Sequence, residues 1–128
     1  MTVEQQSSRT DKTPLQRKRK INAENKRLMS LFENADPNRI DFIRNQVQQL
    51  AWLNVNIAEL QEKINQVGTL VEYDNGGGQS GIRTNPDVKT LTDYQKLSNA
   101  IIRNLLPLVP SQGKRSFTVA LGEMLSNV

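Results

Sequence analysis

Residues 37–67 read PNRIDFIRNQVQQLAWLNVNIAELQEKINQV and contain no helix-breaking residue after Pro37. Their apolar side chains recur at spacings of three and four, which is the pattern of one face of an α-helix. These positions are Ile40, Ile43, Val47, Leu50, Leu53, Ile57, Leu60, Ile64 and Val67. At about 1.5 Å per residue, this helix forms a rod of roughly 45 Å. We expect it to be the central element of the fold.

Three apolar residues of the rod, Phe42, Trp52 and Val55, lie off this main stripe. A helix that is apolar on more than one side cannot cover its surface with one neighbour. Small thin chains often complete their cores by association, and a repeated heterologous contact closes into a ring when the rotation permits. The sequence therefore predicts a homo-oligomer with these three residues at the subunit contacts.

Two cap-then-proline pairs divide the chain into helices. Asp36-Pro37 ends a short amphipathic helix expected over residues 21–35 and starts the rod, because Asp caps helices and Pro suits their first position. Asn85-Pro86 repeats this pattern and starts a further helix that ends before Pro107. Between the rod and that helix, the Asp74-Asn75-Gly76 run indicates either a small β-hairpin or a mobile glycine loop.

The fold expected from these elements is all-α, with the rod and the last helix packed as an antiparallel hairpin. The last helix would present its apolar face to the rod. The residues of that face are Val88, Leu91, Tyr94, Leu97, Ile101, Ile102 and Leu105. Trp52 and Tyr94 are expected to serve packing. We predict a disordered basic arm over residues 1–20, a helical oligomerisation core over 21–110 and a partner-binding tail over 111–128.

Positive charge gathers at one end of the chain. The formal net charge is +4, from 17 basic and 13 acidic residues. Residues 1–27 hold eight basic against three acidic residues, a segregation that favours an anionic partner. The candidate phosphate contacts are Arg17, Lys18, Arg19, Lys20, Lys26 and Arg27. No aromatic residue is interleaved with them, which favours duplex DNA over stacked single strands. A merely solubilising tail is the alternative.

The residue inventory excludes several kinds of chemistry. The chain has no cysteine and no histidine, so thiolate metal sites, disulfides and imidazole bases are excluded. The glycine run lacks the Gly-Lys-Ser/Thr ending of a phosphate-binding loop. The acid pairs Glu59/Glu62 and Asp87/Asp93 are expected on solvated helix faces. We predict no enzyme, catalytic residue, metal, cofactor or small-molecule substrate.

The outer segments add two expectations. No apolar run approaches the roughly 20 residues that span a bilayer, and residues 1–13 are polar, so we expect a cytoplasmic protein without membrane contact. Near the C-terminus, Phe117, Leu121 and Met124 or Leu125 recur at helical spacing. They could dock in a groove of a partner or cap the protein's own helical hairpin.

One segment carries a family resemblance. The run YDNGGGQSGIRTNPDVK at residues 73–89, followed by a helix that ends in LLPLVP at 105–110, resembles the bacteriophage terminase small subunit family. In that family a glycine-rich turn precedes an Asn-Pro-Ala-Val-Lys helix start; here Asp87 stands where alanine is usual. With the rod, the resemblance covers about residues 28–110.

Membership of that family would imply an often ring-shaped oligomer in the host cytoplasm. It would bind double-stranded viral DNA and regulate the large terminase subunit, which carries the ATPase and nuclease; the tail would contact that subunit or the portal. One alternative is a phage scaffold or head-completion protein. Another is a coiled-coil DNA-binding regulator, although Asp36-Pro37 interrupts the continuous helix that such a protein needs.

Overall fold

The computed structural model describes residues 13–110, and residues 1–12 and 111–128 lie outside that description. The described part is mostly helical, as predicted, and adds a two-stranded sheet. Its helices are α2 (Pro14–Met29), α3 (Ile40–Val67) and α4 (Pro86–Leu105), and its strands are β1 (Leu70–Asp74) and β2 (Ser80–Thr84). Short 3₁₀ turns cover Ser30–Phe32, Pro37–Arg39 and Leu106–Leu108.

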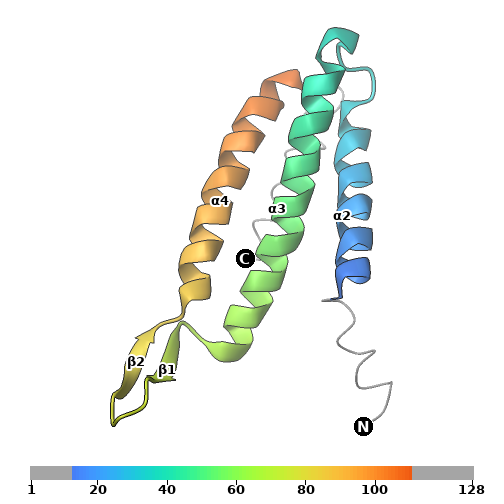
Figure 1. Ribbon diagram of the computed structural model, residues 1–128. Coiled ribbons are helices and arrows are strands. Elements are labelled where there is room, and N and C mark those ends of the chain that lie inside the picture. The colour runs from blue at the N-terminus through green and yellow to red at the C-terminus, as the bar shows by residue number, and fades with distance from the viewer. Residues whose placement is uncertain (1–12, 111–128) are drawn as a thin grey trace.

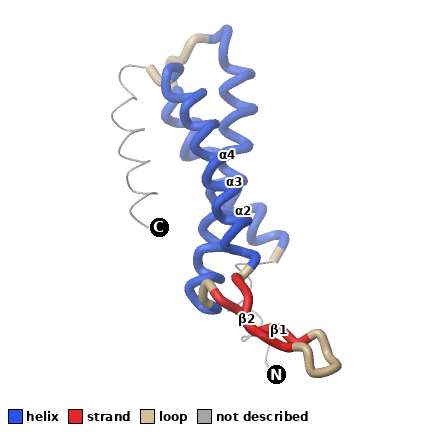
Figure 2. The backbone as a smooth tube through the Cα atoms, turned by 90° about the vertical axis from the view of Figure 1, so that its left-hand side faces the viewer, coloured by secondary structure: helices blue, strands red, loops and turns tan. Residues whose placement is uncertain are grey.

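The long helix α3 lies between the other two helices and runs antiparallel to both (Figure 1). Viewed from the side, the three helices overlap in one narrow band (Figure 2). The predicted antiparallel pair of long helices is therefore present, and α2 is a second neighbour of α3. Because the chain reverses between α2 and α3, these helices do not form the continuous rod of a zipper-type regulator.

The first helix begins at Pro14, so the prediction of a disordered arm over residues 1–20 is wrong for residues 14–20. The Thr13 hydroxyl accepts a hydrogen bond from the backbone N–H of Gln16 at 3.2 Å, and Pro14 occupies the first turn. The basic residues that follow are good helix formers. Because these residues are polar, apolar periodicity did not predict this part of the helix.

The core is concentrated where α2 ends and α3 begins, beside the end of α4. Leu28 and Phe32 come from the first of these segments, and Leu105 and Val109 from the last. The first half of the predicted stripe supplies the centre, and its residues Ile43, Val47, Leu50 and Leu53 are all buried. The second half is only partly covered, ending in Val67 at 53% exposure. The protein's own helices thus cover the first half of the stripe.

Asn85 joins the end of α3 to the start of α4. Its side chain is buried; Nδ2 donates to the Gly68 carbonyl at 2.9 Å and Oδ1 accepts from the Asp87 N–H at 3.0 Å. Its own N–H donates to the Thr69 carbonyl at 2.8 Å. The predicted cap is confirmed, and the same side chain also ties the two helices together.

Of the two predicted alternatives for the glycine segment, the structure has the β-hairpin. Glu72 pairs with Ile82 and Tyr73 with Gly81 in an antiparallel register. Gly76, Gly77 and Gly78 all have positive φ angles, which explains the glycine run at the turn. The hairpin extends beyond the helices (Figures 1 and 2).

Candidate nucleic-acid interface

The basic cluster belongs almost entirely to helix α2. This helix contains six basic residues and one acid, Glu24. All six residues proposed for phosphate contact, Arg17, Lys18, Arg19, Lys20, Lys26 and Arg27, are therefore brought together on one rigid element. Their side chains have different surroundings: Arg17 and Arg27 form one group, Lys18, Arg19 and Lys26 form a second, and Lys20 lines the groove between α2 and α3.

Arg17 is bound to the neighbouring helix. Its Nε lies 3.1 Å from Oε2 and 3.3 Å from Oε1 of Glu59 on α3. The two side chains are 36% and 20% exposed, so the ion pair is partly shielded from water. Arg17 therefore holds α2 on α3, a role that the sequence did not indicate.

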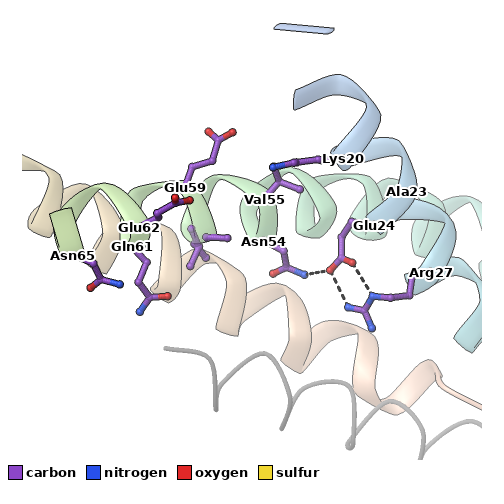
Figure 3. Close-up of a pocket in the computed structure, with 12 residues that line it drawn as sticks. Lys20, Ala23, Glu24, Arg27, Asn54, Val55, Glu59, Gln61, Glu62 and Asn65 are labelled. Carbon is purple, nitrogen blue, oxygen red and sulfur yellow. Dashed lines mark hydrogen bonds and ion pairs between the residues drawn. The ribbon is translucent and has the colours of Figure 1, made fainter. Parts of the chain in front are cut away.

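Arg27 takes part in a second contact between the same helices (Figure 3). Its Nε and Nη2 donate to the two carboxylate oxygens of Glu24 at 2.7 Å and 2.9 Å. Asn54 of α3 donates from Nδ2 to the same carboxylate at 2.8 Å. Burial acts to raise the pKa of Glu24, but the hydrogen bonds from Arg27 and Asn54, with the Arg27 charge, outweigh it and lower the pKa below its ordinary 4.5.

The second group consists of exposed cations. Lys18, Arg19 and Lys26 are exposed, and no ion pair between residues of the described range 13–110 engages them. Arg19 and Lys26 are seven residues apart, so they lie nearly on one line along α2, about 10 Å apart along its axis. This is the surface most available to an anionic ligand.

The groove between α2 and α3 has mixed charge. It measures about 660 Å³ and is lined by Lys20 and Arg27 but also by Glu24, Glu59 and Glu62. Figure 3 shows basic and acidic side chains along the same groove. Carboxylates here would repel phosphate, so a nucleic acid is better placed on the exposed side of α2.

The three residues proposed for oligomerisation do not share one surface. Val55 lines the groove between α2 and α3. Trp52 lines a second, more apolar groove between α3 and α4 together with Leu97, and its ring meets that of Tyr94 edge-on at 5.4 Å. Trp52 and Phe42 remain 43% and 45% exposed. Trp52 and Tyr94 thus serve packing, as predicted; their contact with each other within one chain was not predicted, and apolar surface is left for other contacts.

Three of the four acids in the predicted pairs form ion pairs with neighbouring cations. Glu59 pairs with Arg17, Asp87 with Lys63 at 3.1 Å and Asp93 with Lys89 at 2.8 Å, so these acids are ion-paired rather than simply solvated.

In residues 13–110, no three acidic side chains are grouped as metal ligands would be, and no helix has the length and apolar content to cross a membrane. The tail residues Phe117, Leu121, Met124 and Leu125 lie outside the described residues.

Comparison of the chain with protein-family models, with curated proteins and with solved structures found no match.

Proposed function

We propose that this protein is a small terminase subunit of a phage DNA-packaging machine, which binds viral duplex DNA as a homo-oligomer and recruits or regulates the large ATPase and nuclease subunit. The observation that carries the proposal is the exposed cationic side of α2, where Lys18, Arg19 and Lys26 stand on a helix with six bases and one acid. Such a surface releases counterions from DNA when it meets phosphates.

The mode of contact differs from that of a flexible arm. Arg19 and Lys26 are about 10 Å apart along the helix, which corresponds to roughly three base-pair steps of a duplex. Because the helix is held on α3 through the contacts of Arg17 with Glu59 and of Glu24 with Asn54, these cations are positioned before DNA arrives. Contacts of this kind position a protein on the backbone and do not read base sequence.

The shape of the protein supports association between copies. A narrow layer of three helices has little interior, and Phe42, Trp52 and Leu97 keep between 43% and 55% of their surface exposed. Joining several subunits would cover such residues and gather several cationic helices around one duplex. The C-terminal residues Phe117, Leu121, Met124 and Leu125 are proposed to contact the large subunit, in the host cytoplasm.

The test is duplex binding by fluorescence anisotropy over a range of salt concentrations. We expect the double substitution Arg19→Gln/Lys26→Gln to weaken binding and to make the salt dependence less steep, by about one for each phosphate that the variant no longer neutralises. The matched control Lys96→Gln/Arg103→Gln removes two exposed cations from α4 and should bind as the native protein does.

Equal salt slopes for both double variants would contradict the DNA assignment. A protein that bound no duplex but still associated with capsid components would instead be a scaffold or head-completion protein.

A further inference from the structure

The outward face of the β-hairpin is an exposed apolar and acidic patch. Leu70, Glu72 and Asp74 alternate along β1 and therefore share one face, and Ile82 stands opposite Glu72 on β2. Leu70 is 60% and Ile82 is 68% exposed, the latter the highest value among the large exposed apolar residues of the described range. The residues of this face are exposed and the two residues between them on β1 are partly buried, so the face is turned away from the other residues of the range 13–110.

A two-stranded hairpin is only marginally stable without further packing. The opposite face is partly supported, because the Tyr73 ring lies over Gly81, where an added Cβ would come within 2.9 Å of the Tyr73 hydroxyl. The Arg83 guanidinium also lies 6.0 Å from the centre of the Tyr73 ring. No side chain of the described residues packs on the outward face in this way, so this face is available for contact with another molecule.

A patch of complementary character lies at the start of α2. Leu15 is 58% exposed and Lys18, one turn further along, is exposed beside it. The hairpin thus presents apolar side chains next to carboxylates, whereas α2 presents an apolar side chain next to an ammonium group. Apolar burial combined with opposite charges favours contact between these two surfaces.

The hairpin and the start of α2 lie on opposite sides of α3, towards the same end of the protein (Figure 1). The hairpin leaves the layer beside α4, while the start of α2 lies on the far side of α3 (Figure 1). Because the hairpin extends beyond the helices, copies in one orientation that are set side by side and offset along the helix axes would bring the hairpin of each against α2 of the next. Such a contact is heterologous and can repeat around a ring.

We propose that the outward face of the β-hairpin of one subunit packs on the first turns of α2 of the next subunit, with Leu70 and Ile82 against Leu15 and with Glu72 and Asp74 near Lys18. This inference rests on the homo-oligomer of the proposed function and specifies its interface. In this arrangement Lys18 belongs to the subunit contact, and the DNA surface of α2 consists of Arg19, one turn beyond Leu15 at the edge of that contact, and Lys26.

Cysteine cross-linking tests this interface directly, since the native chain contains no cysteine. Under mild oxidation, the double variant Leu15→Cys/Ile82→Cys should give a ladder of covalent multimers, while each single variant stays monomeric on a denaturing gel. The control Leu15→Cys/Asn38→Cys should give no ladder, because the turn containing Asn38 lies at the opposite end of the protein (Figure 1).

Dimers of Ile82→Cys alone would overturn the proposal, since they would mean that two hairpins pack on each other. No cross-link in a double variant that light scattering shows to be oligomeric would overturn this interface and leave the proposed function standing. Native protein that is monomeric by light scattering would overturn both.

Charge reversal provides a second, independent measurement. Glu72→Lys and Lys18→Glu should each raise the concentration at which the oligomer forms, by roughly ten-fold, because each places like charges together. The combined variant should return towards the native value, and Glu62→Lys should behave as native because Glu62 lies in neither patch. Failure of the combined variant to recover would contradict the pairing of these charges.

Discussion

The guanidinium of Arg17 on α2 binds the carboxylate of Glu59 on α3, with Nε 3.1 Å from Oε2. Through this contact Arg17 stabilises the packing of α2 on α3, whereas other basic residues of the cluster remain exposed at the surface. It also means that substitutions along α2 should separate into two phenotypes, one in stability and one in DNA binding.

Arg17→Gln is expected to lower the free energy of unfolding by no more than about 1 kcal/mol, because a partly exposed ion pair contributes little. Arg19→Gln should leave stability unchanged but weaken duplex binding more than Arg17→Gln does. Urea unfolding and anisotropy measure the two effects, and a cycle with Glu59→Gln isolates the coupling. Loss of DNA binding by Arg17→Gln equal to that of Arg19→Gln, at native stability, would place Arg17 at the DNA surface instead.

Glu24 should make the stability of the protein depend on pH in the acid range. Its pKa in the folded protein lies below the ordinary 4.5, so folding favours the ionised form. That stabilisation is complete above the pKa of the unfolded chain and is lost as the pH falls through the lower folded pKa.

The native protein should therefore lose more stability than Glu24→Gln between about pH 5 and about pH 3, measured by urea unfolding. The control Glu33→Gln removes the same charge at an exposed position and should keep the native pH dependence. Parallel curves for the native protein and Glu24→Gln would show that the contacts from Arg27 and Asn54 contribute nothing.

Two identical substitutions on α4 test where the core lies. Leu105 is fully buried and Leu97 is 55% exposed. Leu105→Ala should cost about 2–5 kcal/mol, because it removes buried methyl groups and leaves a cavity. Leu97→Ala should cost less than about 1 kcal/mol in the isolated subunit. Thermal unfolding with equal losses for both variants would contradict the packing described.

Asn85 provides a test of the junction between α3 and α4. Asn85→Asp keeps the oxygen that caps α4 but replaces the Nδ2 donor with a second oxygen facing the Gly68 carbonyl. It should therefore destabilise the protein by about 1–3 kcal/mol, although Asp is in general as good a cap as Asn. The reciprocal exchange Asp36→Asn, at an exposed cap, should change stability by less than about 0.5 kcal/mol. A native unfolding midpoint for Asn85→Asp would mean that the bond to Gly68 has no energetic role.

Local patterns predicted the helices well where apolar periodicity or a cap was present. The rod ends at Val67 as expected, and its regular α-helix begins at Ile40 after one 3₁₀ turn at Pro37–Arg39. The start of α2 was misplaced because Arg17 to Lys20 show no apolar spacing, although Thr13 and Pro14 form a cap. The choice between hairpin and loop stayed open because Asp74 to Gly78 permit either.

The sequence by itself determined that a long amphipathic helix, a capped helix at Asn85-Pro86 and a concentration of positive charge exist, because each depends on residues close together in the chain. Only the tertiary structure decided which cations remain at the surface. Glu59 lies 42 positions from Arg17, and Asn54 lies 30 from Glu24. Ion pairs and hydrogen bonds across such separations form only when packing of the apolar faces brings α2 onto α3, and no local pattern encodes them.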